Sequence, residues 1–85
     1  MKKIKAIEQA KQIAESDYNK FMSRYGCFDP DFIRPWKSHK EDNGSTSYAL
    51  QGTPNKAFVF YFPKFKKVLA VRSNGTVLKT FHTDD

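Results

Sequence analysis

Apolar side chains recur every three or four residues through the first part of the chain, and this spacing constrains the fold more than any other feature. On an α-helix, positions spaced in this way share one face, so residues 4–25 are predicted to form an amphipathic helix that packs on the rest of the protein. Gly26 follows as a stop signal, because glycine readily takes the left-handed conformation that ends helices. The recurring positions are Ile4, Ile7, Ala10, Ala14, Tyr18, Phe21, Met22 and Tyr25.

The second half of the chain has the pattern of β-strands. Four strand-like runs, at residues 47–51, 57–62, 68–73 and 76–82, are separated by turn-forming residues, and the last three are rich in β-branched and aromatic residues. The last two runs are joined by Asn74-Gly75, which favours a two-residue type I′ turn. The predicted fold class is therefore α+β, with a long N-terminal helix on one face of a four-stranded antiparallel sheet.

A chain of 85 residues has room for one domain. We expect a helical part at residues 2–36, a polar, exposed and mobile loop at 37–46, and the sheet at 47–82. Within the helical part, residues 29–31 start and Pro35 ends one short helical turn. Apolar residues around this turn are expected to close the end of the core; they are Phe28, Phe32, Ile33 and Trp36.

The predicted last hairpin has two different faces. With a type I′ turn, Ala70 pairs with Lys79 and Leu69 with Thr80. We assign to the helix the face that carries Leu69, Val71, Leu78, Thr80 and His82. The other face, with Val68, Ala70, Arg72, Val77, Lys79 and Phe81, is assigned to solvent or ligand. Arg72 and Lys79 beside Phe81 would suit phosphates and stacked bases, and an ordinary solvated face with one exposed phenylalanine is the alternative.

The chain is basic, with 15 lysines and arginines against 9 acidic residues and a net charge of +6. Such a charge favours polyanionic partners through long-range attraction and release of counterions. Nucleic acid is the first expectation, and a membrane surface or an acidic protein is the second. The sequence has no apolar run long enough to cross a bilayer, so membrane insertion is not expected.

Residues 36–40 carry the densest polar chemistry. His39 stands between Lys37 and Lys40, next to Trp36, and positive neighbours favour the neutral imidazole that can act as a base. Cleavage of RNA without a metal needs a base for the ribose 2′-hydroxyl, an acid for the leaving oxygen, and cations for the charge on the phosphorane. A solvated loop histidine is the alternative interpretation.

The remaining chemistry-bearing residues are scattered. His82 could form an acid and base pair with His39 or cap the edge of the core, and Thr80 offers a hydroxyl donor. Cys27 has no partner for an internal disulfide and is expected to be a buried apolar side chain. The histidines, the cysteine and Asp84 show no ligand spacing, so we expect neither a metal nor another cofactor.

Three stretches together resemble the end of a family of bacterial toxin nucleases. They are Ser47-Tyr48-Ala49-Leu50, the run from Ala57 through Phe62 to Pro63-Lys64, and the hairpin from Val68 through Asn74-Gly75 to Thr80-Phe81. The sequence is similar here to colicin D-like tRNases and contact-dependent inhibition toxins of the barnase, EndoU, colicin and RelE superfamily. The resemblance covers about two fifths of the chain.

The resemblance implies that RNA lies on the sheet face opposite the helix. It also implies that lysines and a histidine ahead of the sheet act with a Ser or Thr on the last strand, which here are Lys37, His39, Lys40 and Thr80. The hairpin register predicted above puts Thr80 on the core face instead. Either the hairpin contains a bulge or the role of Thr80 does not carry over.

The resemblance implies a biological setting as well. Such domains are C-terminal parts of large secreted proteins, cleave tRNA in the cytoplasm of a neighbouring bacterium, and are held inactive in the producer by an acidic immunity protein.

The leading hypothesis is accordingly a metal-independent ribonuclease toxin that cleaves tRNA, with Arg72, Lys79, Phe81, Trp36 and His82 as further RNA contacts. The main alternative is a non-catalytic basic module, of the kind made by phages or plasmids, that binds RNA or an acidic host protein. The two hypotheses differ at His39, which the nuclease needs beside a phosphate and the binding module does not.

Overall fold

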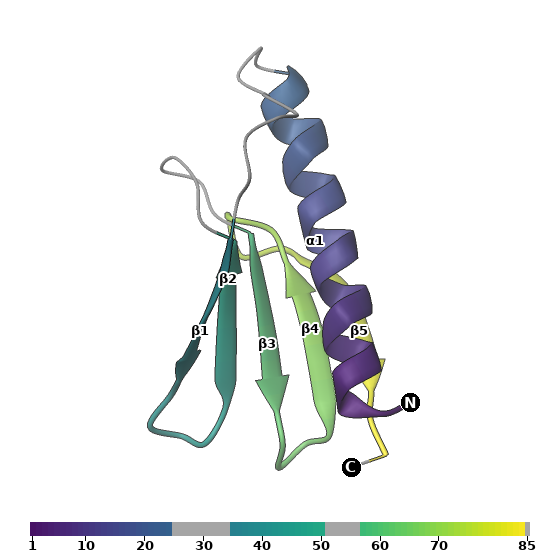
Figure 1. Cartoon of the computed structure of the whole chain (residues 1–85), viewed down its shortest axis with the longest axis vertical. Coiled ribbons are helices and arrows are strands. Elements are labelled where there is room, and N and C mark those ends of the chain that lie inside the picture. The colour runs from purple at the N-terminus through teal and green to yellow at the C-terminus, as the bar shows by residue number, and fades with distance from the viewer. Residues whose placement is uncertain (25–34, 51–56, 85) are drawn as a thin grey trace.

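The computed structural model describes residues 1–24, 35–50 and 57–84. It contains one helix, α1, and five strands, β1 to β5. The helix packs on one side of an antiparallel sheet (Figure 1), so the predicted α+β class is confirmed. The predicted short helical turn before Pro35, the stop at Gly26 and the position of Cys27 lie outside the described residues.

The helix α1 spans Lys3–Arg24, in agreement with the sequence pattern. Its buried side chains recur every fourth residue and are Ala6, Ala10, Ala14, Tyr18 and Met22. The three alanines are completely buried, and their small side chains let the helix lie close to the sheet. Ile4 was expected on this face but is 65% exposed. It precedes Ala6 by two positions, a rotation of about 200° around the helix axis, and therefore points away from the sheet.

The five strands are β1 Trp36–Lys40, β2 Thr46–Leu50, β3 Phe58–Phe62, β4 Lys67–Val71 and β5 Val77–His82. They follow one another across the sheet in chain order, and every neighbouring pair is antiparallel. The prediction of four strands was wrong because β1 forms within the segment that was predicted to be a mobile loop. This strand lies at the sheet edge and is mostly exposed, so it has none of the apolar alternation that reveals a strand in a sequence.

The turn between β4 and β5 lies at Asn74-Gly75, as predicted, but its type differs. The Gly75 amide donates to the Arg72 carbonyl at 2.9 Å, and the Arg72 amide donates to the Thr76 carbonyl at 2.8 Å. Only Gly75 has a positive φ, of 93°, whereas a type I′ turn needs two such residues. The connection is therefore a three-residue loop that ends in a left-handed glycine.

The turn between β1 and β2 repeats this geometry. The Gly44 amide donates to the Glu41 carbonyl at 3.1 Å, the Glu41 amide donates to the Ser45 carbonyl at 2.8 Å, and Gly44 has a φ of 88°. In addition, Asn43 Oδ1 accepts a hydrogen bond from the Ser45 amide, as Asn74 Oδ1 does from the Thr76 amide, each at 3.0 Å. The same short sequence, Asn-Gly followed by a hydroxyl residue, thus closes both hairpins.

The helix covers the face of β4 and β5 that was predicted to be open. The core joins the alanines of α1 to Leu50, Val59, Val68, Ala70 and Phe81. Leu69 and Thr80 pair with each other, as predicted, but on the opposite face. The face assignment was wrong because β4 is apolar on both sides, so alternation did not distinguish the two. An irregularity between Ala70 and Val71 also shifts the register, and Val71 pairs with Val77 rather than with Leu78.

The position of α1 leaves most of the sheet surface uncovered. The helix packs on β3, β4 and β5, while β1 and β2 extend beyond it (Figure 1). On the other side of the sheet, no helix or strand among the described residues lies over the strands. We call that uncovered side the open face.

Candidate nucleic-acid interface

The open face is built from three rows of side chains that run across the strands. The register places one row at Lys37, Ala49, Phe58, Val71 and Val77. The next row is His39, Ser47, Phe60, Leu69 and Thr80, and the third is Phe62, Lys67 and His82. Apolar side chains thus occupy most of the centre of the open face. The edge strands carry the polar side chains of Lys37, His39, Thr80 and His82, together with Val77.

Three phenylalanines line the central strand of the open face. Phe58, Phe60 and Phe62 alternate along β3, with ring centroids 5.9 and 6.3 Å apart and with nearly parallel planes. Each is only partly buried, and with Leu69 and Val71 they line a shallow depression of about 410 Å³. We call Phe58, Phe60 and Phe62 the phenylalanine row. Flat rings exposed on a sheet are a surface on which nucleic acid bases can stack.

A small polar cluster lies at the β1 edge. His39 Nε2 is 4.0 Å from Glu41 Oε2, and the two side chains are 76% and 42% exposed. The Ser47 hydroxyl donates to Glu41 Oε1 at 3.0 Å and approaches the His39 carbonyl oxygen at 3.3 Å. An imidazole and a carboxylate at this distance can exchange protons with a bound substrate. Glu41 and Ser47 were not predicted as site residues from the sequence. The position of Glu41, two residues after His39, was the available signal that it belongs to the site.

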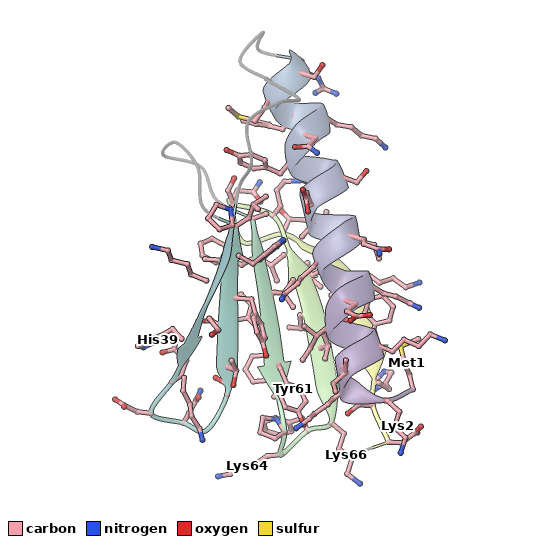
Figure 2. All side chains as sticks on the ribbon, viewed as in Figure 1. Met1, Lys2, His39, Tyr61, Lys64 and Lys66 are labelled. Atoms are coloured by element: carbon pink, nitrogen blue, oxygen red, sulfur yellow. The ribbon has the colours of Figure 1, made fainter. Side chains whose placement is uncertain are left out.

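The segment from Trp36 to Lys40 is divided between the two sides of the sheet. Because successive strand residues point to opposite faces, Lys37 and His39 lie on the open face, whereas Trp36 and Lys40 lie on the helix side. These residues were expected to form one cluster, with Lys37, His39 and Lys40 in a loop that follows Trp36. Only Lys37 and His39 can therefore contact a ligand on the open face, and Figure 2 shows His39 at the outer edge of the sheet.

On the helix side, the rings of β1, β2 and β3 contact lysines of α1. Lys11 Nζ lies 5.8 Å from the centre of the Trp36 ring and 4.6 Å from that of Tyr48. Lys3 Nζ lies 5.7 Å from the Tyr61 ring. Burial, with a smaller contribution from Tyr61, raises the pKa of Tyr48 above its ordinary value. These cation–π contacts hold α1 against the part of the sheet beyond its main packing surface.

Thr80 and His82 lie at the opposite edge of the open face from His39. Both side chains are exposed on β5. Thr80 therefore lies on the side opposite the helix, where the family resemblance would place it. However, β1 and β5 are separated by four strand spacings, about 19 Å along the sheet at 4.8 Å per spacing. The structure does not bring His39 together with Thr80 or His82 at one phosphodiester group.

Of the other predicted RNA contacts, Arg72 lines the depression at the phenylalanine row, whereas Lys79 and Phe81 lie on the helix side of β5. Arg72 donates to both carboxylate oxygens of Asp17 on α1, at 3.0 Å each. These hydrogen bonds, together with the Asp17 charge, raise the pKa of Arg72. Phe81 is only 9% exposed in the core, and Lys79 Nζ lies 6.0 Å from its ring. Arg72 thus holds the helix to the sheet.

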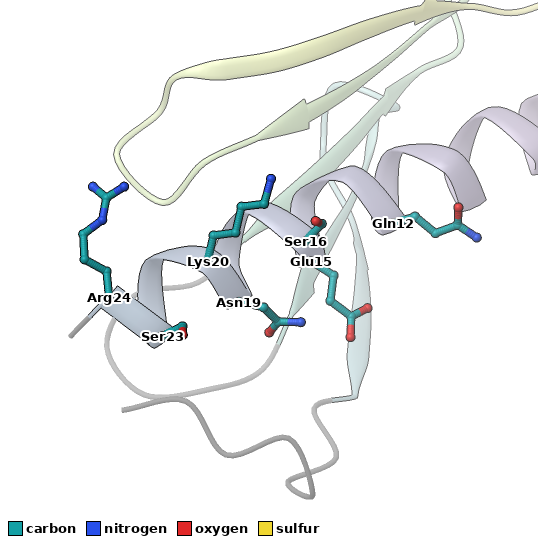
Figure 3. A pocket seen from close by; sticks show the side chains of 7 residues that line it. All are labelled: Gln12, Glu15, Ser16, Asn19, Lys20, Ser23 and Arg24. Carbon is teal, nitrogen blue, oxygen red and sulfur yellow. The ribbon is translucent and has the colours of Figure 1, made fainter. Parts of the chain in front are cut away.

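A separate hollow of about 850 Å³ lies along the C-terminal half of α1. Figure 3 shows that its polar side chains all come from this one helix; they are Gln12, Glu15, Ser16, Asn19, Lys20, Ser23 and Arg24. They carry charges of both signs and no aromatic ring. The hollow offers neither a stacking surface nor a uniform charge for a nucleic acid.

Within residues 1–24, 35–50 and 57–84, no group of three or more histidine, cysteine or acidic side chains is arranged to hold a metal ion. The one helix in this part of the chain is too polar to span a membrane. No protein-family model, curated protein or solved structure matches the chain.

Proposed function

We propose that the protein binds single-stranded RNA on its open face, with the phenylalanine row as the stacking surface. The observation that carries this proposal is the row itself: three parallel aromatic rings on the central strand of a sheet face that no described element covers. Leaving them exposed to water would be unfavourable without a ligand. Bases of a single strand are accessible for stacking, whereas those of a duplex are enclosed.

The charge around the sheet supports a polyanionic ligand. Residues 35–50 and 57–84 contain seven lysines and arginines, at positions 37, 40, 64, 66, 67, 72 and 79, against three acidic residues, at 41, 42 and 84. On the open face, Lys37 and Lys67 flank the phenylalanine row on either side. Such cations bind the phosphates while the rings bind the bases, as in other proteins that bind single strands with little sequence preference.

The test is binding of a labelled single-stranded oligonucleotide, followed by fluorescence anisotropy at fixed salt. Phe60→Ala should weaken binding by about 1–3 kcal/mol, the usual contribution of one stacked base. Ile4→Ala is the matched control, because it removes an exposed apolar side chain from α1 and should leave affinity unchanged. Equal affinities of the Phe60→Ala protein and the unmodified protein would contradict the proposal.

A second candidate function is metal-independent cleavage of the bound RNA, for which the polar cluster at the β1 edge is the supporting observation. In this proposal His39 accepts the proton of a ribose 2′-hydroxyl, which attacks the phosphorus and displaces the 5′ oxygen, and solvent water supplies the proton to that leaving oxygen. Lys37, on the same face two residues earlier, offsets the charge that develops on the phosphate. The Glu41 carboxylate, 4.0 Å from the imidazole, would stabilise the imidazolium that forms when His39 takes up the proton.

The tRNA substrate and the acidic immunity protein belong to this second candidate, as does action in the cytoplasm of a target bacterium. An acidic protein that covered the open face would block RNA binding and cleavage together. The test is incubation of purified tRNA with the protein in the presence of a chelator, followed by a denaturing gel. Discrete fragments ending in a 2′,3′-cyclic phosphate would support cleavage, and intact tRNA would leave RNA binding as the function.

A further inference from the structure

The turn between β3 and β4 directly follows the last member of the phenylalanine row and carries an exposed aromatic side chain. Its four residues, 63–66, are held by hydrogen bonds from the Phe65 amide to the Phe62 carbonyl at 3.2 Å and from the Lys66 amide to the Pro63 carbonyl at 3.3 Å. The first bond keeps the backbone of Phe65 beside that of Phe62, the last member of the row. Phe65 itself is 69% exposed, the most exposed large apolar side chain in the described part of the chain.

The same end of the molecule is strongly cationic. Figure 2 shows Lys64 and Lys66 extending from the turn, with Met1 and Lys2 at the same end of the molecule. Lys67 follows directly at the start of β4, and its side chain is exposed. At this end of the sheet, the carboxylate of Asp84 binds the Met1 ammonium group at 2.7 Å and is therefore already neutralised. The other acidic residues at this end of the sheet, Glu41 and Asp42, belong to the β1–β2 turn and not to the turn at 63–66. The lysines of the turn remain available for another anion.

We infer that a single strand lying on the phenylalanine row continues past Phe62 onto this turn, where Phe65 forms a fourth stacking platform and Lys64 and Lys66 bind its phosphates. This inference rests on the proposed RNA binding and specifies the ligand: a single strand of at least four nucleotides that runs along β3.

The spacing of the rings supports an unstacked strand. Ring centroids 5.9 and 6.3 Å apart exceed the rise of about 3.4 Å per nucleotide in a duplex strand. Bases that each contact one ring must therefore be spread apart, which a single strand allows and a duplex does not.

An anionic membrane is the other polyanionic surface that lysines around an exposed ring can bind. The structure favours RNA because Phe65 lies on the turn that directly follows a row of three partly exposed rings on β3, whereas membrane binding would use the tip of the turn alone. The RNA proposal thus accounts for the phenylalanine row and the turn with one ligand.

The experiment measures affinity for a labelled eight-nucleotide single-stranded RNA across a range of salt concentrations. In the Lys64→Ala/Lys66→Ala variant, the loss of two phosphate contacts should flatten the plot of log affinity against log salt by about 1.4 units. Phe65→Ala should weaken binding by about 5- to 150-fold at fixed salt. The control variant Lys20→Ala/Arg24→Ala removes two exposed charges from the far end of α1 and should change the slope by much less.

Two further arms separate the possible outcomes. A duplex of the same sequence should bind the unmodified protein more weakly than the single strand does. Vesicles of phosphatidylcholine and phosphatidylserine should show no binding that depends on Phe65. Unchanged slope and affinity in the turn variants, while Phe60→Ala still weakens binding, would overturn this inference and leave RNA binding intact. Phe65-dependent binding to vesicles without binding to RNA would overturn both.

Discussion

Arg72 and Asp17 form a bidentate ion pair that links the β4–β5 hairpin to α1, across 55 positions of the chain. This pair links the helix to the sheet and engages the guanidinium group that the sequence analysis assigned to RNA. Arg72→Gln should lower the melting temperature because it removes this link, and Asp17→Asn should lower it similarly. The double variant should be no less stable than either single variant, because both remove one interaction. Additive losses would show that the two residues act separately. RNA affinity should change little in all three proteins.

The alanine stripe of α1 leaves no room for larger side chains. Ala10 is fully buried between helix and sheet, so Ala10→Leu should force the two apart and destabilise the protein by about 1–3 kcal/mol. Denaturant unfolding monitored by circular dichroism measures the change. Gln12→Leu, on the exposed side of the same helix, should stay within about 0.5 kcal/mol of the unmodified protein.

The glycines of the two Asn-Gly turns should each resist substitution for a purely backbone reason. Gly44 and Gly75 have φ values of 88° and 93°, and a Cβ atom added to either would meet no atom within 4 Å. Gly75→Ala and Gly44→Ala should therefore each cost about 1–2 kcal/mol, the strain of a left-handed alanine. Urea unfolding curves give the values. A loss much larger than this would mean that the turn also makes contacts that a methyl group blocks.

If the protein cleaves RNA, His39→Ala should reduce the rate by about a hundredfold to ten-thousandfold, the usual contribution of a positioned proton-transfer group. Because the His39 side chain is 76% exposed, stability should change by at most about 0.5 kcal/mol. Thr80→Ala should have a much smaller effect on the rate, since Thr80 lies four strands away. A single-turnover assay on tRNA distinguishes the two variants. Equal losses would require Thr80 and His39 to act on one phosphate.

Asp84 should titrate below its ordinary value of 3.8. The hydrogen bond from the Met1 ammonium group lowers its pKa most, and the charges of that group, Lys2 and Lys66 lower it further. A depressed pKa means that the carboxylate stabilises the fold above the unfolded value and that this contribution disappears as the pH falls through the folded value. Two-dimensional NMR titration of the side-chain carboxyl gives the pKa, and Asp84→Asn should remove this part of the acid dependence.

The helix and the four apolar strands were predictable because their apolar residues recur with the spacing of a helix or of a strand. The strand β1 was not, since its exposed polar residues carry no periodic signal, and its pairing depends on a turn at Asn43-Gly44 that was interpreted as a loop. The open face was also misassigned. Val68, Leu69, Ala70 and Val71 are apolar on both sides of β4, so only the packing of α1 decides which side is buried.

The candidate site was likewise predictable only in part. Lys37, His39 and Thr80 were chosen from the sequence, and all three lie on the open face. The phenylalanine row was overlooked because Phe58, Phe60 and Phe62 alternate with Val59 and Tyr61, so both sides of β3 are apolar or aromatic. The contact of Glu41 with His39 depends on side-chain geometry at the end of β1, which the sequence does not specify.

The sequential order of the strands has a consequence for folding. Each strand pairs with the next one along the chain, so the hairpins can close over short stretches and should form early. The helix α1 is synthesised first, but its alanine stripe packs on β3, β4 and β5, and Arg72 lies far downstream. The apolar side of α1 can therefore be fully buried only after β5 has emerged from the ribosome.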